Sequence, residues 1–197
     1  MNPIILDPDT KEPVNIFQEL LNSRIFFLSG IIDEAKAKEF VANVMLLNLK
    51  STEDKITIFI NSGGGDIRSV FMIYDVLKLI SCPVEFIIMG ACEKEAIILL
   101  GAPKNVKRLA TKNSLLLVDQ LSYAGVQYSA LEDVKVINNI LSKDNKKFIK
   151  ILAEQVGRTE SQVKSDLENK KYFSPKKAIE YGLIDDIATA QEASNEE

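Results

Sequence analysis

The chain has 197 residues, enough for one globular domain with a short appendage. Its hydrophobic content of 46% and charged content of 26% are typical of a soluble globular protein. A net charge of −4 without a clear basic stripe argues against binding to nucleic acid or to an anionic membrane. Histidine is absent, which excludes a Ser-His-Asp triad, a Cys-His pair or a His-bound metal in this chain acting alone.

The beginning of the chain and its cysteines bear on the compartment. The opening residues, MNPIILDPDTKEP, are acidic and interrupted by proline, so we expect no signal peptide. Apolar runs stay shorter than the roughly 20 residues of a membrane helix. Cys82 and Cys92 are too few for a disulfide framework and lack the spacing of metal ligands. These features predict a cytoplasmic protein without a metal or another cofactor.

Three apolar segments typical of strands are each followed by a helical pattern. The strands are expected at Arg24–Gly30, Lys55–Ser62 and Val84–Gly90, and the helices at Asp33–Leu49, Asp66–Ile80 and Cys92–Gly101. A repeat of about 30 residues is typical of βα units, which form a parallel sheet with right-handed crossovers. Because the strands are almost continuously apolar, we expect helices on both faces of the sheet.

The second half of the chain predicts two further strands and a long helix. The strands are expected in VKRLAT and SLLLVDQ, and the helix at about Val126–Val156. The apolar stripe of this helix is longer than one small core needs, so part of it is expected to pack on another subunit.

Capping signals mark two shorter helices near the end of the chain. Thr159 and Gln162 form a capping-box pattern, and Ser174 followed by proline is a typical helix start. Gly182 is expected to end the last helix, and LIDDI reads as a closing strand.

The loop INSGGGDI places Gly63–Gly65 between a buried strand and a helix. Glycine lets backbone amides approach a ligand closely, and a helix N-terminus favours negative charge. The loop would therefore suit a phosphate, a carboxylate or an oxyanion. It matches neither the G-x-x-x-x-G-K-[ST] nor the G-x-G-x-x-G motif, and a purely structural turn is an equal alternative.

Charged residues follow the third strand, in the segment MGACEKEAIILL. Lys94 could act as a nucleophile or general base if burial lowered its pKa, but lysine is rarely buried and an exposed position is favoured. Cys92 has no histidine to activate it, which favours a structural role. Asp119 ends an apolar strand and is either a surface residue or one that faces a cleft.

Several ordered motifs resemble the Clp protease proteolytic subunit, ClpP (peptidase S14), within the ClpP/crotonase superfamily. INSGGGDI is similar to the family's N-S-P-G-G, MGACEKEA to G-x-A-A-S-M-G-A, LLLVDQ to M-I-H-Q, and YFSPKKAIEYGLID to its closing motif. The similarity covers nearly the whole chain, from about Val14 to Ile187.

This resemblance implies the fold and its division. We expect an α/β fold of the ClpP/crotonase type, a spiral of ββα units with a protruding long handle helix at about residues 126–156. Residues 14–188 would form the domain, residues 1–13 a flexible N-terminal segment, and residues 189–197 a polar C-terminal tail.

The resemblance also implies where the active site would lie. The family's serine falls on Lys94, its histidine on Asp119 and its aspartate on Lys170. The amides of Gly65 and Glu95 match the oxyanion hole. No catalytic residues are therefore expected, as in the inactive ClpR partners of ClpP. We also expect Lys94 and Asp119 to form an ion pair that plugs the former site.

Three functions are compatible with this sequence. The first is an inactive, structural or regulatory subunit in heptameric or tetradecameric rings, with a catalytically active ClpP-like paralogue and an AAA+ Clp unfoldase as candidate partners. The second is an enzyme with altered acid-base or acyl-transfer chemistry on the same scaffold. The third is a stand-alone homo-oligomeric binding protein.

Overall fold

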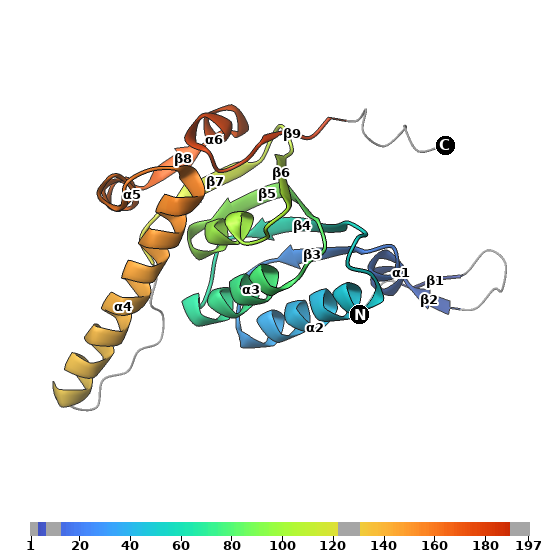
Figure 1. Ribbon diagram of the computed structural model, residues 1–197, viewed down its shortest axis with the longest axis horizontal. Helices are drawn as coiled ribbons and strands as arrows, with labels where there is room; N and C mark the ends of the chain where they lie inside the picture. Colours follow the sequence, from blue (N-terminus) through green and yellow to red (C-terminus); the bar gives the residue numbers. More distant parts are fainter. Residues whose placement is uncertain (1–3, 7–12, 122–130, 190–197) are drawn as a thin grey trace.

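A computed structural model describes residues 4–6, 13–121 and 131–189. Its largest element is a seven-stranded sheet in which β3, β4, β5, β6 and β9 lie side by side, while β7 pairs with β5 and β8 with β7 (Figure 1). The strands are β3 (Ile25–Ser29), β4 (Ile56–Ser62), β5 (Val84–Glu93), β6 (Val106–Ala110), β7 (Leu115–Val118), β8 (Lys171–Phe173) and β9 (Asp186–Ile187). The β3–β4, β4–β5 and β5–β6 pairs are parallel, which confirms the predicted βα organisation.

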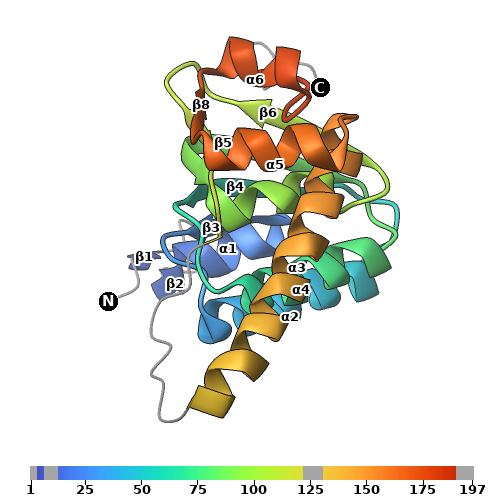
Figure 2. The ribbon, with the colours of Figure 1, turned by 90° about the vertical axis from the view of Figure 1, so that its left-hand side faces the viewer.

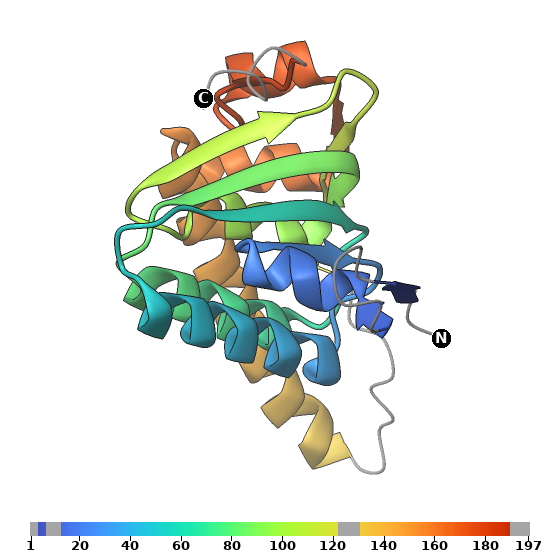
Figure 3. The same ribbon diagram turned by 90° about the vertical axis from the view of Figure 1, so that its right-hand side faces the viewer.

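Helices cover this sheet and extend beyond it. They are α1 (Ile16–Asn22), α2 (Glu34–Lys50), α3 (Ile67–Leu79), the 3₁₀ helix η1 (Lys94–Gly101), α4 (Leu131–Val156), α5 (Glu160–Glu168) and α6 (Pro175–Tyr181). Figure 3 shows α2 and α3 side by side against one face of the strands. Two short strands, β1 (Ile4–Leu6) and β2 (Pro13–Asn15), form an antiparallel pair near the N-terminus that the sequence did not predict.

The periodicity of each helix matches the face that it buries. In α2, Ala37, Phe40, Val44 and Leu47 recur at helical spacing and are all buried. The 3₁₀ helix η1 is different, because every residue from Glu95 to Leu100 is buried. A helix that is apolar almost all round belongs inside the core, and η1 packs between α3 and α4.

Strand β5 contains an irregularity that the sequence did not predict. Ile60 pairs with Ile88, whereas Ser62 pairs with Cys92, so β5 carries two more residues than β4 over this interval. Gly90 adopts a φ of 103° there. This bulge divides the strand, because residues before it pair with β6 and residues after it pair with β7. The strand therefore continues past Gly90, where the sequence suggested a turn, to Glu93.

The long helix α4 projects from the body of the molecule (Figures 1 and 2). Near its C-terminal end, Phe148 and Leu152 are fully buried where the helix packs on η1 and α5. Its N-terminal half extends away from the sheet, in the region predicted as the handle. The helix begins at Leu131, and residues 126–130 of the predicted range lie outside the described part.

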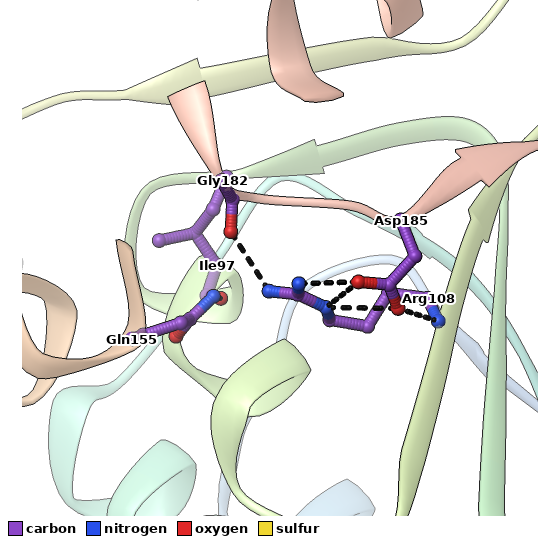
Figure 4. A network of polar contacts seen from close by, with 5 residues as sticks. All are labelled: Ile97, Arg108, Gln155, Gly182 and Asp185. Carbon is purple, nitrogen blue, oxygen red and sulfur yellow. Dashed lines mark hydrogen bonds and ion pairs between the residues drawn. The ribbon is translucent and has the colours of Figure 1, made fainter. Parts of the chain in front are cut away.

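A polar network anchors the segment after α6 to β6 (Figure 4). The Arg108 guanidinium donates to the Gly182 carbonyl at 2.8 Å and to both carboxylate oxygens of Asp185. The Arg108 amide also donates to Asp185 at 2.7 Å. Nearby, Gln155 Nε2 donates to the Ile97 carbonyl and ties α4 to η1. The Arg108 contacts hold the segment before β9 against β6, at the edge of the sheet.

The same network predicts a dependence of stability on pH. Partial burial raises the pKa of Asp185, but hydrogen bonds from Arg108 outweigh this and hold the pKa below its ordinary value. A lowered folded-state pKa stabilises the protein above the unfolded-state pKa of about 3.9, and the contribution disappears as pH falls through the folded-state pKa. We expect Asp185→Asn to lower the urea midpoint at pH 7 and to have a smaller effect as pH falls below about 3.9. An exposed neighbour offers the control Asp186→Asn, and a deficit of Asp185→Asn that stayed constant with pH would contradict the assignment.

Candidate functional site

Three turns meet at the carboxyl ends of β3, β4 and β5. Ile32 follows β3 and forms a parallel bridge with Gly65 in the glycine loop after β4. The Ile32 amide donates to the Gly64 carbonyl at 2.9 Å, and the Asp66 amide donates to the Ile32 carbonyl at 2.8 Å. The carboxyl ends of parallel strands are the usual place for ligands in α/β proteins. The turn from β5 into η1 lies against the same loop, because a Cβ on Gly64 would lie 3.1 Å from Lys94 Cβ.

The glycines of the loop are required by geometry at two positions. A Cβ on Gly65 would lie 2.2 Å from the Ile32 carbonyl oxygen, and Gly64 has a φ of 93°. Gly63 is different, because a Cβ there would meet nothing closer than a Glu93 oxygen at 3.8 Å. Close approach to Ile32 therefore explains Gly65, and a left-handed backbone explains Gly64.

The amides of this loop already donate to acceptors within the protein. Gly64 N–H donates to Ser62 Oγ at 3.2 Å, and Gly65 N–H donates to Glu95 Oε2 at 3.1 Å. At the start of α3, Asp66 accepts from the Ser69 amide at 2.8 Å and caps the helix. Of the two glycine amides, only that of Gly65 donates to a carboxylate, and that carboxylate belongs to the chain itself.

Lys94 lies at a strained elbow between β5 and η1. Its φ of 50° is in the left-handed region, which a side chain other than glycine rarely adopts. Sharp strand-to-helix turns of this kind expose the nucleophile in serine hydrolases. Cys92, two residues earlier, is fully buried, and burial raises the pKa of its thiol far above its usual range. A reactive thiolate is therefore disfavoured, in agreement with the structural role expected for Cys92.

Asp119 forms an ion pair with Lys170, which corrects the predicted pair of Lys94 and Asp119. Asp119 Oδ2 lies 3.5 Å from Lys170 Nζ, and Oδ1 accepts from the Gln120 amide at 2.8 Å. The reason is the antiparallel register of β7 and β8. It sets Val118 opposite Lys171 and so brings the adjacent residues, Asp119 and Lys170, together. Lys170 also has a φ of 48°.

A double-mutant cycle tests this pairing. Lys170 keeps 67% of its side chain exposed, so solvent screens the pair and limits its coupling energy to roughly 0.5 kcal/mol. We expect Asp119→Asn and Lys170→Met to be non-additive by about this amount in urea unfolding. The matched cycle of Asp119→Asn with Lys94→Met should be additive. If only the cycle with Lys94→Met showed coupling, the partner of Asp119 would be Lys94 and not Lys170.

The contact of the Glu95 carboxylate with the glycine loop was not predicted from the sequence. The sequence suggested the Glu95 amide for the oxyanion hole and, in the altered-enzyme alternative, the side chains of Lys94, Glu93 or Glu95 for acid-base work. Glu95 is 0% exposed. A signal was present, because Glu95 directly precedes the apolar run AIILL, and an acid next to such a run must either turn outward or find a buried partner.

The described residues contain neither a metal-binding cluster nor a membrane-spanning helix. Within residues 4–6, 13–121 and 131–189, no three His, Cys, Asp or Glu side chains converge as metal ligands. Over the same residues, no helix combines the length and the hydropathy of a membrane span.

The parallel sheet, the glycine loop beside a strained elbow and the projecting helix are consistent with an α/β protein of the ClpP fold. The family model of the Clp protease matches residues 9–191. The chain belongs to this family.

Curated relatives agree with the family match. The chain is 33% identical over 178 residues to ATP-dependent Clp protease proteolytic subunit 3 of Frankia casuarinae, covering 90% of this chain and 83% of the relative. It is 30% identical to proteolytic subunit 1 of Thermobifida fusca, covering 92% of this chain and 81% of that protein. It is 32% identical to proteolytic subunit 2 of the same Frankia strain, covering 90% and 81% of the two chains.

Proposed function

We propose that this chain is a non-catalytic subunit of a Clp-type proteolytic complex. The observation that carries the proposal is the combination of Lys94, Asp119 and Lys170 at the positions where the family resemblance places serine, histidine and aspartate. The full sequence holds no histidine that could replace the missing base.

The arrangement of charges supports the loss of catalysis. In a triad, a base takes the proton of the nucleophile. A lysine ammonium at position 94 has no lone pair for attack until a base removes a proton, and the chain has no histidine to do so. Asp119 and Lys170 form an ion pair at the positions of the family's histidine and aspartate. The negative charge now lies at the histidine position and the positive charge at the aspartate position. An oxyanion hole without a triad gives only about 10³–10⁴-fold acceleration over water, far too little for efficient peptide hydrolysis.

Exposed apolar side chains on α2 and α3 support a role in assembly. An open groove of about 540 Å³ runs between the two helices, and Met45, Met72 and Leu79 line it. Leu79 is 82% exposed, and Met45 and Met72 are also exposed. Apolar patches of this kind commonly mark contacts between proteins. Members of the Clp protease family form ring complexes with paralogues, and in the proposed ring a neighbouring subunit would cover this groove.

The proposed partner is a catalytically active Clp proteolytic subunit in a heptameric or tetradecameric ring. Together they would work with an AAA+ unfoldase in the cytoplasm, where ATP is available to drive unfolding. The chain would form part of the ring wall and its outer surface, and its partner would carry out the hydrolysis.

Co-expression tests this role. The chain would carry an affinity tag, and an untagged active proteolytic subunit from the same genome would be its partner. We expect a mixed ring whose peptidase turnover is proportional to the number of active subunits. A ring of this chain alone, with the active subunit left behind, would favour the stand-alone binding protein.

A further inference from the structure

Glu95 is a buried acid whose carboxylate has a defined binding place. It is the second residue of η1, and its side chain is 0% exposed. Its Oε2 accepts a hydrogen bond from the Gly65 amide at 3.1 Å. A Cβ on Gly64 would lie only 2.3 Å from the same oxygen. The absence of a side chain at Gly64 therefore provides the space that the carboxylate fills.

The backbone amides on either side of Gly65 donate hydrogen bonds to groups other than Glu95. The Gly64 amide donates to Ser62 Oγ, and the Asp66 amide donates to the Ile32 carbonyl. The Gly65 amide is thus the member of this series that the carboxylate uses. The N–H···O distance of 3.1 Å equals the upper end of the range for donors that stabilise an oxyanion, about 2.7–3.1 Å.

We infer that Glu95 is a tethered anion that keeps the oxyanion pocket of this subunit filled. The inference rests on the proposed function, because the family resemblance assigns the Gly65 amide to the oxyanion hole. A substrate carbonyl would have to displace a buried charged group that already holds this donor. The pocket is accordingly a carboxylate-binding site, and truncation of Glu95 creates a cavity that takes a small free carboxylate.

Hydrogen exchange of the Gly65 amide tests the contact directly by NMR. Glutamine has nearly the same shape but no charge, and charge-assisted hydrogen bonds are roughly twice as strong as neutral ones. We expect the Gly65 amide to exchange about tenfold faster in Glu95→Gln than in the unmodified chain. The matched control is Glu93→Gln, which changes the carboxylate beside Gly63 and should leave Gly65 exchange unaltered. Equal exchange in Glu95→Gln and the unmodified chain overturns the inference.

Acetate provides a second test, in Glu95→Ala. Acetate should raise the Tm of this variant by about 3 °C at ten times its Kd, whereas acetamide, its neutral counterpart, should not. The unmodified chain, whose pocket is filled, should not respond to acetate beyond its response to chloride. If folded Glu95→Ala responds to acetate and acetamide alike, the inference is wrong. If Glu95→Ala does not fold, the exchange of Gly65 in Glu95→Gln decides alone.

Failure of this inference and failure of the proposed function look different. Suppose that Gly65 amide exchange is the same in Glu95→Gln as in the unmodified chain, and that the chain has no peptidase activity. The tethered anion is then ruled out, while the non-catalytic role stands. Suppose instead that Glu95 does protect the Gly65 amide from exchange, but that the chain has peptidase activity. The proposed function is then ruled out, and catalysis would have to use other groups.

Discussion

Gly65→Ala is expected to lower the free energy of unfolding by about 3–5 kcal/mol, or to prevent folding. The added Cβ would lie 2.2 Å from the Ile32 carbonyl oxygen and 2.6 Å from the Ile32 nitrogen. Both contacts are with backbone, which cannot rotate away as a flexible side chain could. Overpacking of this kind costs about 1–3 kcal/mol, and displacement of Ile32 also weakens its two backbone hydrogen bonds with the loop, of about 1 kcal/mol each.

Gly63→Ala is the matched control from the same loop. Its added Cβ would meet nothing closer than 3.8 Å, and Gly63 does not have a positive φ. Its unfolding free energy should lie within about 1 kcal/mol of the unmodified chain, because alanine also restricts the unfolded state. Urea denaturation of both variants provides the measurement. Equal losses for the two glycines would mean that the contact between Ile32 and Gly65 does not determine the shape of the loop.

Arg24→Met is expected to lower stability by about 2–3 kcal/mol, since several carbonyl groups lose a charged donor together. The guanidinium donates to the carbonyls of Leu47, Asp54 and Lys55 at 3.0, 2.8 and 3.1 Å. The first of these lies in the last turn of α2, whose partial negative charge favours a cation. One side chain thus joins the start of β3, the end of α2 and the start of β4.

A second arginine provides the control for charge alone. Arg68 lies 3.8 Å from Asp144, and its side chain is 66% exposed, so Arg68→Met should change stability by less than about 0.5 kcal/mol. Arg24→Lys keeps the charge but not the planar fork, and it should recover at most about half of the loss in urea unfolding. Full recovery by lysine would show that the fork geometry is unimportant.

The parallel core was predictable because hydrophobic burial imposes a simple pattern. Strands β3 and β4 are mostly apolar runs, and the face that α2 buries has helical spacing. The capping box of Thr159 and Gln162 is also present, because its hydrogen bonds are local. Local chemistry and burial are the two kinds of information that a single sequence expresses most directly.

Features that depend on register were not predictable in the same way. Gly90 looked like the end of a strand, but it lies in a bulge after which β5 turns to a second set of neighbours. The partner of Asp119 depends on the pairing of β7 with β8, and β8 is only three residues long. Spacing along the chain does not specify such pairings, so the predicted pair with Lys94 was wrong.

The side chain of Glu95 illustrates a different limit. Its position beside the elbow was visible in the sequence, and the family resemblance assigned a role to its amide. The direction of its carboxylate depends on the empty space beside Gly64, which only the folded loop creates. The triad positions, by contrast, rest on motif resemblance alone, so the positions and their non-catalytic character are both proposals that activity must test.

Peptidase turnover by the purified chain tests this central claim most directly. The substrate is a short fluorogenic peptide, which needs no unfoldase, and the chain is assayed alone and as its Lys94→Ala variant. We predict that neither protein produces turnover above that of buffer at any chain concentration. Turnover that rises in proportion to the unmodified chain and disappears in Lys94→Ala would contradict the claim and identify Lys94 as a catalytic residue.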